Sequence, residues 1–181
     1  MSDTVVIYKS KYGFTKQYAQ WISEELSADL FDIKSIKIED FQKYQTIIYG
    51  GGIYAGGLNG AQLITKSYES IKNKNIVVFT CGLTNPNDIE NLQTINEGLD
   101  RSFPGEIKSK IKIFNLRGGI DYPKLSFFDK TIMKMFNKIL EKKSPEQINE
   151  DDKKLINSNG EKVDFTDKKY IIPIVSYVKS L

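Results

Sequence analysis

A short stretch near the start of the chain carries the residues best suited to hold a ligand. Residues 10–15 combine two hydroxyls, a lysine and a glycine, between a β-branched run at 4–8 and a segment of helical periodicity. Backbone N–H groups at a helix start, the positive end of its dipole and a glycine that permits close approach suit a phosphate monoester. The candidate phosphate-binding residues are Ser10, Lys11, Tyr12, Gly13, Phe14 and Thr15.

The turn at 10–15 does not match two common nucleotide motifs. It lacks the Gly-x-x-x-x-Gly-Lys-Ser/Thr spacing of triphosphate loops and the Gly-x-Gly-x-x-Gly spacing of dinucleotide-binding turns. An ordinary strand-to-helix turn, whose hydroxyls only cap the helix, is the alternative. We favour a site for a phosphate monoester.

Short β-branched runs alternate with segments of helical periodicity as far as residue 116. Strands are predicted at 4–9, 29–38, 45–49, 75–80 and 111–116, and helices at 15–26, 60–71 and 88–99. This alternation predicts an α/β fold with a doubly wound parallel sheet and helices on both faces.

Three of the predicted strand ends are rich in glycine or turn residues. They follow Lys9, Tyr49 and Thr80, and ligands of doubly wound sheets bind beyond the carboxyl ends of the strands. A flat ligand with a phosphate tail would fit across three such ends. The alternative is that the glycines simply terminate the strands.

The whole chain is interpreted as a single domain, residues 1–181. The polar run at 142–162 is predicted to be a surface excursion. Residues 166–181 are predicted to form a closing helix, which Pro173 either kinks or delays. The chain shows no leader and no apolar run long enough to span a bilayer, so we expect a cytoplasmic protein.

The composition limits the chemistry that side chains can perform. The 181 residues include no histidine and one cysteine, Cys81, which excludes histidine-dependent catalysis, multi-cysteine metal sites and internal disulfides. We therefore expect no metal, assign no catalytic side chain and expect a cofactor to carry any reaction. The net charge of +3, without a basic stretch interleaved with aromatics, does not argue for binding to nucleic acid.

The turn Ser10-Lys11-Tyr12-Gly13-Phe14-Thr15 matches Ser/Thr-x-x-Gly-x-Thr, the phosphate loop of the flavodoxin family, which the chain therefore resembles. Within that family it is similar to the menaquinone-dependent protoporphyrinogen dehydrogenase group. This similarity rests on residues 50–56 and on Gly118-x-x-x-Tyr122-Pro123-Lys124 before an aromatic, basic helix. The resemblance implies a flavodoxin-like five-stranded parallel sheet of order 2-1-3-4-5, with an extra helix and loop inserted at about 120–163.

The resemblance also implies that the cofactor is FMN. Residues 10–15 would hold its ribityl phosphate, the loop at 51–57 would flank the flavin ring, and a third loop would approach the pyrimidine edge through backbone groups. The ring-binding residues implied in this way are Gly51, Gly52, Ile53, Tyr54, Ala55, Gly56, Cys81, Gly82 and Leu83.

The chain departs from the family pattern in three respects. Its second-loop aromatic, Tyr54, comes one place earlier than in the protoporphyrinogen dehydrogenase group, so either Tyr54 stacks on the ring or Ala55 takes that position. The third loop has Leu83 where many flavodoxins place a second aromatic ring. The chain is slightly basic, whereas typical flavodoxins are strongly acidic.

Two further features near the implied flavin have alternative interpretations. The Gly56–Gly57 peptide either changes orientation on flavin reduction, which glycine makes inexpensive, or forms a tight turn into the next helix. Cys81 is either a redox thiol or a small buried side chain, and we favour the buried side chain.

Residues 126–143 form a predicted basic amphipathic helix that begins with Ser126 and Asp129. Apolar residues line one face, and lysines recur every four residues along another. The apolar residues are Phe128, Ile132, Met135, Phe136 and Ile139, and the lysines are Lys130, Lys134, Lys138 and Lys142. Such a helix fits peripheral contact with the inner face of a membrane, a lid beside the flavin, or a helix packed on the sheet with a solvated lysine face.

These interpretations lead to an FMN-binding oxidoreductase that performs two-electron flavin chemistry with a hydrophobic substrate or a quinone acceptor. The resemblance adds a protoporphyrinogen dehydrogenase-like activity. The alternative is an electron-transfer carrier that serves partner redox proteins, followed by a cofactor-free fold that only binds partners.

Overall fold

The computed structural model describes residues 2–54, 57–141, 148, 150–158 and 160–181. The chain divides into two compact units, of which the first comprises residues 1–118 with 166–181 and the second comprises residues 119–165. The first unit contains the parallel sheet, and the second contains a small antiparallel pair with two helices.

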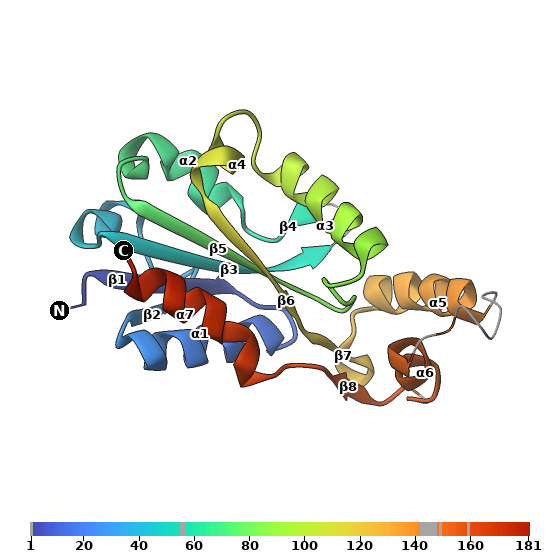
Figure 1. Cartoon of the computed structure of the whole chain (residues 1–181). Coiled ribbons are helices and arrows are strands. Elements are labelled where there is room, and N and C mark those ends of the chain that lie inside the picture. The colour runs from blue at the N-terminus through green and yellow to red at the C-terminus, as the bar shows by residue number, and fades with distance from the viewer. Residues whose placement is uncertain (1, 55–56, 142–147, 149, 159) are drawn as a thin grey trace. The chain divides into compact units, whose positions relative to one another are not determined.

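The first unit is built on a parallel sheet with helices on both faces (Figure 1). Within the described residues, five parallel strands lie in the order β2-β1-β3-β5-β6. They are β1 (Thr4–Lys9), β2 (Asp29–Asp32), β3 (Thr46–Tyr54), β5 (Asn75–Gly82) and β6 (Lys112–Arg117), and the short β4 (Gly57–Leu58) pairs antiparallel with β3. Counting the parallel strands alone, this is the predicted order 2-1-3-4-5, so the expected α/β fold is confirmed.

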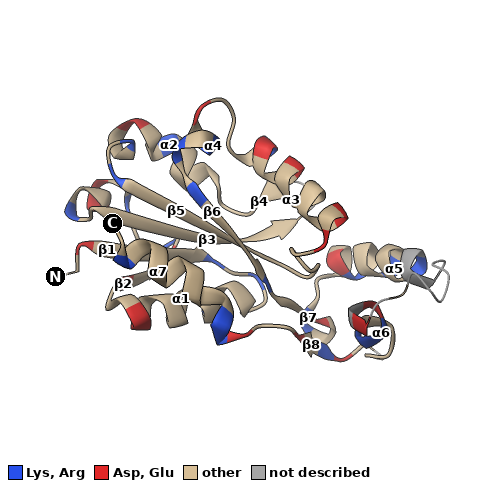
Figure 2. Cartoon of the chain, in the orientation of Figure 1, with Lys and Arg blue, Asp and Glu red and all other residues tan. Residues whose placement is uncertain are grey.

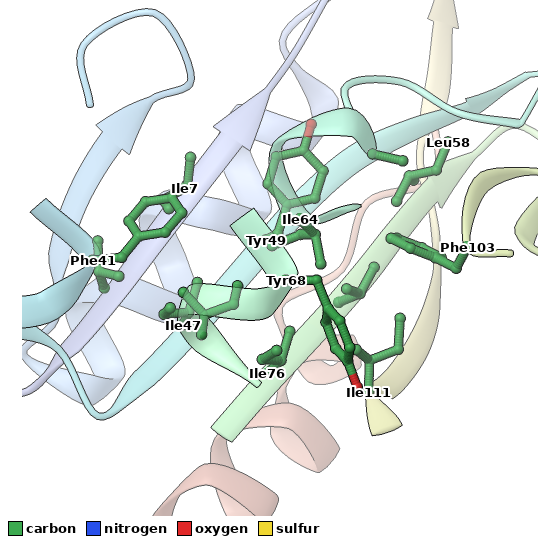
Figure 3. Packing of buried hydrophobic residues seen from close by; sticks show 14 of the residues in the cluster. Ile7, Phe41, Ile47, Tyr49, Leu58, Ile64, Tyr68, Ile76, Phe103 and Ile111 are labelled. Atoms are coloured by element: carbon green, nitrogen blue, oxygen red, sulfur yellow. The ribbon is translucent and has the colours of Figure 1, made fainter. Parts of the chain in front are cut away.

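The helices of the first unit cover the two faces with separate hydrophobic clusters (Figure 1). One face carries α1 (Phe14–Leu26) and α7 (Ile172–Lys179), and the other carries α2 (Gln62–Ile71) and α3 (Ile89–Ser102). Because side chains alternate along a strand, Val5 and Ile7 enter the α2–α3 cluster while Val6 enters the α1–α7 cluster. Figure 3 shows the α2–α3 cluster, in which Tyr49 and Phe103 are among the largest buried side chains.

The second strand is shorter than the sequence predicts. β2 ends at Asp32 rather than continuing to residue 38. The carboxylate of Asp32 accepts a hydrogen bond from the Lys34 N–H at 3.0 Å, and its carbonyl accepts one from the Ser35 N–H at 2.8 Å. This local turn ends the strand, and a 3-10 helix follows at Ile38–Lys43.

The third strand is longer than the sequence predicts, because it runs through the three glycines to Tyr54 instead of stopping at Tyr49. The glycines therefore do not terminate the strand. A Cβ at Gly50 would overlap the ring of Phe79, which belongs to the α1–α7 cluster. Glycine at this position is thus a packing requirement of the neighbouring strand β5, which itself continues to Gly82.

The predicted effect of Pro173 on the closing helix is confirmed. Pro173 lies in the first turn of α7, where its missing N–H costs no helical hydrogen bond. A 3-10 helix at Lys168–Ile171 precedes α7. The Asp167 carboxylate caps this 3-10 helix by accepting a hydrogen bond from the Lys169 N–H at 2.9 Å.

Among the residues of the second unit that the structure describes, there are two strands and two main helices, and the sequence predicted only one of these four elements. β7 (Gly119–Asp121) pairs antiparallel with β8 (Lys162–Asp164), and α5 (Phe127–Glu141) packs against α6 (Glu150–Ile156). Helix α5 is the expected basic helix. The other three elements, and α4 (Ile107–Lys110) of the first unit, were not predicted, since each is short. No helix in the part of the chain that the structure describes is long and apolar enough to cross a membrane.

Candidate functional site at the carboxyl ends of the strands

The turn between β1 and α1 has the backbone of a preformed loop. Gly13 occupies the N-cap position of α1 with φ +97° and ψ −27°, a backbone conformation that residues other than glycine rarely adopt. No atom lies within 4 Å of the position that a Cβ on Gly13 would take. The glycine is therefore required by backbone conformation, and the space beside it is open. The Gly13 N–H donates to the Ser10 Oγ at 3.0 Å.

The start of α1 fits an anionic group. The helix has no side-chain cap and no acidic residue in its first turn, so its positive end is not neutralised locally. Thr15 is only 4% exposed, and its hydroxyl forms no hydrogen bond within the described residues. Lys11 supplies a positive charge in the same turn, where its ammonium lies 5.3 Å from the centroid of the Tyr12 ring.

Strand pairing brings the three predicted loops to one edge of the sheet. Lys9 pairs with Gly51, and Gly51 pairs with Thr80, so the ends of β1, β3 and β5 lie side by side. The predicted second-loop residues Gly51, Gly52 and Ile53 nevertheless belong to strand β3. Cys81 and Gly82 likewise belong to β5, and only Leu83 lies beyond its end. Ala55 and Gly56 lie outside the described residues.

The two glycines at the end of β3 accommodate close neighbours. A Cβ on Gly51 would lie 2.6 Å from the carbonyl oxygen of Asn59, and one on Gly52 would lie 2.8 Å from the ring of Tyr54. The Tyr54 ring thus lies against the backbone of its own strand while 43% of the residue stays exposed. An exposed aromatic beside bare backbone is a suitable wall for a flat ring.

A buried tyrosine fixes the turn that follows the β3–β4 hairpin. The Tyr49 hydroxyl donates to the carbonyl of Asn59 at 2.6 Å, and the Asn59 N–H donates to the Gly52 carbonyl at 2.9 Å. Burial raises the pKa of Tyr49, so its hydroxyl remains a neutral donor. Gly60 follows with φ +80°, and a Cβ there would overlap the Tyr49 hydroxyl.

The hairpin is also clamped to α3 by a serine that the sequence did not single out. The Ser102 Oγ accepts a hydrogen bond from the Leu58 N–H at 2.7 Å and donates one to the Gly98 carbonyl at 2.7 Å. Gly57, with φ +116°, packs so closely that a Cβ would overlap the Ser102 Oγ. The close approach of Ser102 accounts for glycine at position 57. Both interpretations of the Gly56–Gly57 peptide stay predictions, because Gly56 lies outside the described residues.

Gly118 connects the third loop with the first. Its N–H donates to the Gly82 carbonyl at 2.6 Å, and a Cβ on Gly118 would lie 2.6 Å from the Sγ of Cys81 and 3.4 Å from the Cβ of Phe14. Cys81 is 7% exposed, as the interpretation of a small buried side chain expects.

Arg117 is a buried cation at the same edge, and the sequence analysis gave it no role. It is 8% exposed, and its Nε donates to the Leu83 carbonyl at 3.4 Å. Its own carbonyl accepts a hydrogen bond from the Tyr18 hydroxyl at 2.6 Å. The available signal was a charged residue directly after a buried strand and before two glycines, where a plain strand end would need no arginine.

A family comparison decides what kind of domain this edge belongs to. Residues 5–147 match the family model described as a flavodoxin domain. The chain belongs to the flavodoxin domain family. Members of this family generally bind flavin. A search of curated proteins found no match to this flavodoxin domain.

Three solved structures illustrate the similarity of this flavodoxin domain to known proteins. Oxidised flavodoxin 2 from Bacillus cereus is 17% identical over 85% of this chain and 92% of that chain, with a TM-score of 0.41. The Trp repressor binding protein from Bacillus subtilis is 19% identical over 64% and 82%, with a TM-score of 0.44. A flavodoxin from the domain Archaea is 12% identical over 63% and 82%, with a TM-score of 0.42. Because these scores are below 0.5, family membership rests on the match at 5–147.

Proposed function

We propose that this flavodoxin domain binds FMN and acts as an oxidoreductase between a hydrophobic substrate and a quinone-type acceptor, in the manner of a protoporphyrinogen dehydrogenase. The observation that carries the proposal is the open, uncapped start of α1 behind Gly13, at a sheet edge where two further strand ends meet. A phosphate there would receive backbone N–H groups and the Thr15 hydroxyl.

The residues of the chain would divide the work of holding the cofactor. The turn at 10–15 would bind the phosphate, Tyr54 would cover one face of the ring, and the loop after Gly82 would meet the pyrimidine edge. When bound, the flavin supplies one- or two-electron transfer. Ser102 and Tyr49 would keep the β3–β4 hairpin in place, because both hold its backbone through hydrogen bonds.

The carrier function of flavodoxins is the second candidate, favoured by family membership itself. The net charge of +3 favours the enzyme instead, because strongly acidic surfaces suit docking of carriers to basic partner proteins. Leu83 points in the same direction, since a half-buried aliphatic side chain at the third loop leaves more room for a hydrophobic substrate than an aromatic ring does.

FMN binding is tested by titrating the purified protein with FMN and, in parallel, with riboflavin, which lacks the phosphate. We expect a flavin absorption spectrum, an FMN-dependent rise in melting temperature and much weaker binding of riboflavin. Gly13→Ala should weaken FMN binding about 10-fold or more while leaving riboflavin binding nearly unchanged, because a strained cap misplaces the phosphate donors.

Gly105→Ala is the matched control for Gly13→Ala. Gly105 also has a positive φ, +64°, and no atom lies within 4 Å of its Cβ position. Both variants introduce a Cβ into open space at a position of positive φ, but Gly105 lies away from the turn at 10–15. Equal FMN affinity in the two variants, or no flavin binding by the parent protein, would contradict the proposal.

The enzyme and the carrier are separated by turnover. Rapid-mixing reduction with candidate hydrophobic substrates, such as a porphyrinogen, is followed by reoxidation with a menaquinone analogue. Repeated turnover supports the oxidoreductase. Electron exchange with partner redox proteins alone, without turnover of substrate and quinone, would support the carrier.

A further inference from the structure

Only some faces of helix α5 contact the other described residues of the second unit. At its start the Ser126 Oγ accepts the Asp129 N–H at 3.2 Å and donates to the Asp129 carboxylate at 2.7 Å. Farther along, the Asn137 Nδ2 donates to the Tyr122 Oη at 3.4 Å. Met133 and Phe136, which lie within about one helical turn of Asn137, are half-buried. These contacts anchor the helix and leave other faces outward.

One outward face of α5 is apolar. Phe128, Ile132 and Met135 follow one another at intervals of four and three residues, which places them on a single face. They are 71%, 45% and 64% exposed, and Phe127 beside them is 89% exposed. Isolated exposed apolar residues are ordinary, but three on one face within two turns of a helix form a surface that water does not favour, while Phe127 falls on the stripe of Lys130, Lys134 and Lys138.

A row of lysines lies beside this apolar face. Lys130, Lys134 and Lys138 are exposed at intervals of four residues, and none forms an ion pair within the described residues. No acidic residue occurs in the sequence between Lys130 and Leu140. Figure 2 shows acidic colour at the start of α5 and basic colour towards its end, as the helix dipole favours.

The positive charge of the protein is concentrated in this segment. Residues 126–143 contain five lysines and two acidic residues, a net charge of +3, which equals the net charge of the whole chain. The remaining residues are therefore balanced in charge. Within α5 itself three lysines outnumber Asp129 and Glu141, and this excess of positive charge indicates an anionic partner for the helix.

We propose that α5 lies along an anionic lipid bilayer, with Phe128, Ile132 and Met135 inserted at the acyl boundary and the lysines at the lipid phosphates. A lipid surface presents uniform negative charge above an apolar layer, which matches lysines of one sign repeated beside an unbroken apolar face. The long stems of the lysines let their ammonium groups reach the phosphates while the helix sits lower. The inference does not use the flavin and stands independently of it.

The charge half of the proposal is tested with the full-length protein and sedimented vesicles. We expect binding to vesicles that contain phosphatidylglycerol, weak binding to phosphatidylcholine alone, and release by salt. The triple variant Lys130→Gln, Lys134→Gln, Lys138→Gln should lower partitioning about 100-fold, since each lysine near an anionic surface contributes about fivefold. The control Lys34→Gln, Lys66→Gln, Lys110→Gln removes the same charge from exposed lysines of the first unit and should bind nearly as the parent does.

The apolar half is tested with Phe128→Ser, Met135→Ser, which should lower partitioning at least 10-fold. Its control is Ile89→Ser, Ile172→Ser, because those two residues are 82% and 60% exposed on the first unit. All four substituted positions are exposed, so both variants should keep the far-ultraviolet circular dichroism spectrum and the melting temperature.

Insertion depth is read directly from Phe128→Trp in a Trp21→Phe background, which leaves one tryptophan in the chain. Its fluorescence should shift to shorter wavelength when phosphatidylglycerol vesicles are added. Absence of vesicle binding, equal binding to neutral vesicles, or equal losses in the lysine variant and its control would overturn the proposal. Self-association that Phe128→Ser abolishes, without vesicle binding, would also overturn it and assign the face to a second copy of the chain.

Discussion

The hydroxyl of Ser102, near the end of α3, accepts a hydrogen bond from the backbone N–H of Leu58 at 2.7 Å. The two residues are 44 positions apart, and this bond ties the β3–β4 hairpin to a helix on the α2–α3 face of the sheet. The same oxygen donates to the Gly98 carbonyl. One small side chain thus fixes the loop that, in our proposal, flanks a flavin ring.

Ser102→Ala should destabilise the fold by about 1–3 kcal/mol, because it leaves the Leu58 N–H unpaired beside a buried side chain. The free energy of unfolding in urea measures this loss. Ser109→Ala is the control, since the Ser109 hydroxyl also donates to a backbone carbonyl, at 2.7 Å, but in an exposed position. A loss no larger in Ser102→Ala than in Ser109→Ala would show that the clamp is not stabilising.

Gly50→Ala should be more damaging than an alanine in an ordinary strand, because the new methyl group would overlap the Phe79 ring. We expect a loss of about 1–3 kcal/mol or more. Phe79→Leu, which removes the obstructing ring, should make the glycine substitution much less costly. A double-mutant cycle on the two positions, measured by denaturation, should give a coupling free energy above about 1 kcal/mol. Additive losses would contradict the contact.

The stability of the protein should fall at alkaline pH partly through Tyr44. Burial, together with the hydrogen bond that its hydroxyl donates to Asp29 at 3.0 Å, raises the pKa of Tyr44 from 10.0 to about 12. A raised folded-state pKa means that the contribution is complete below about pH 10 and is lost as the pH rises towards about 12. Tyr44→Phe should therefore show a shallower decline of the unfolding free energy over this window. Identical slopes for the variant and the parent would contradict the assignment.

Arg117 should raise the midpoint potential of a bound flavin, given that the protein binds one. The arginine holds the Leu83 carbonyl of the loop assigned to the pyrimidine edge, and a nearby buried cation favours added negative charge. Arg117→Met should lower the potential by about 50 mV, on the order expected for one charge at protein dielectric. Arg101→Met is the control, because it removes the other arginine of the chain from an exposed position. Equal potentials in the two variants would remove this role from Arg117.

The sequence predicted the parallel strands themselves because β-branched runs such as Val5-Val6-Ile7 are local signals, whereas the order of the strands came from the resemblance to the flavodoxin family. The start of a helix could also be predicted from neighbouring residues. Ser126 and Asp129 pair as the sequence predicts, and the pyrrolidine of Pro173 sits where a helix tolerates it. Each of these features depends on residues within one turn of each other, so no knowledge of the rest of the fold was needed.

The course of β3 through its glycines and the roles of Ser102 and Arg117 were missed because they depend on contacts between residues that are distant in sequence. A run of three glycines terminates a strand or makes room for a ring with equal ease, and only the position of Phe79 across the sheet decides between them. Ser102 and Arg117 reach partners 44 and 34 residues away. No spacing in the sequence predicts these hydrogen-bonded pairs, because each forms only once the strands are arranged in the sheet.

The hydroxyl of Tyr18 has a consequence for how the protein can change over evolution. It donates to the carbonyl of Arg117 and accepts the N–H of Asp167 at 3.3 Å. Arg117 and Asp167, which lie just before and just after the segment 119–165, are therefore both hydrogen-bonded to the Tyr18 hydroxyl. This shared partner keeps them close together whatever the segment contains. A segment of another length or composition could replace residues 119–165, or the segment could be lost, without altering the spacing of the strands in the sheet.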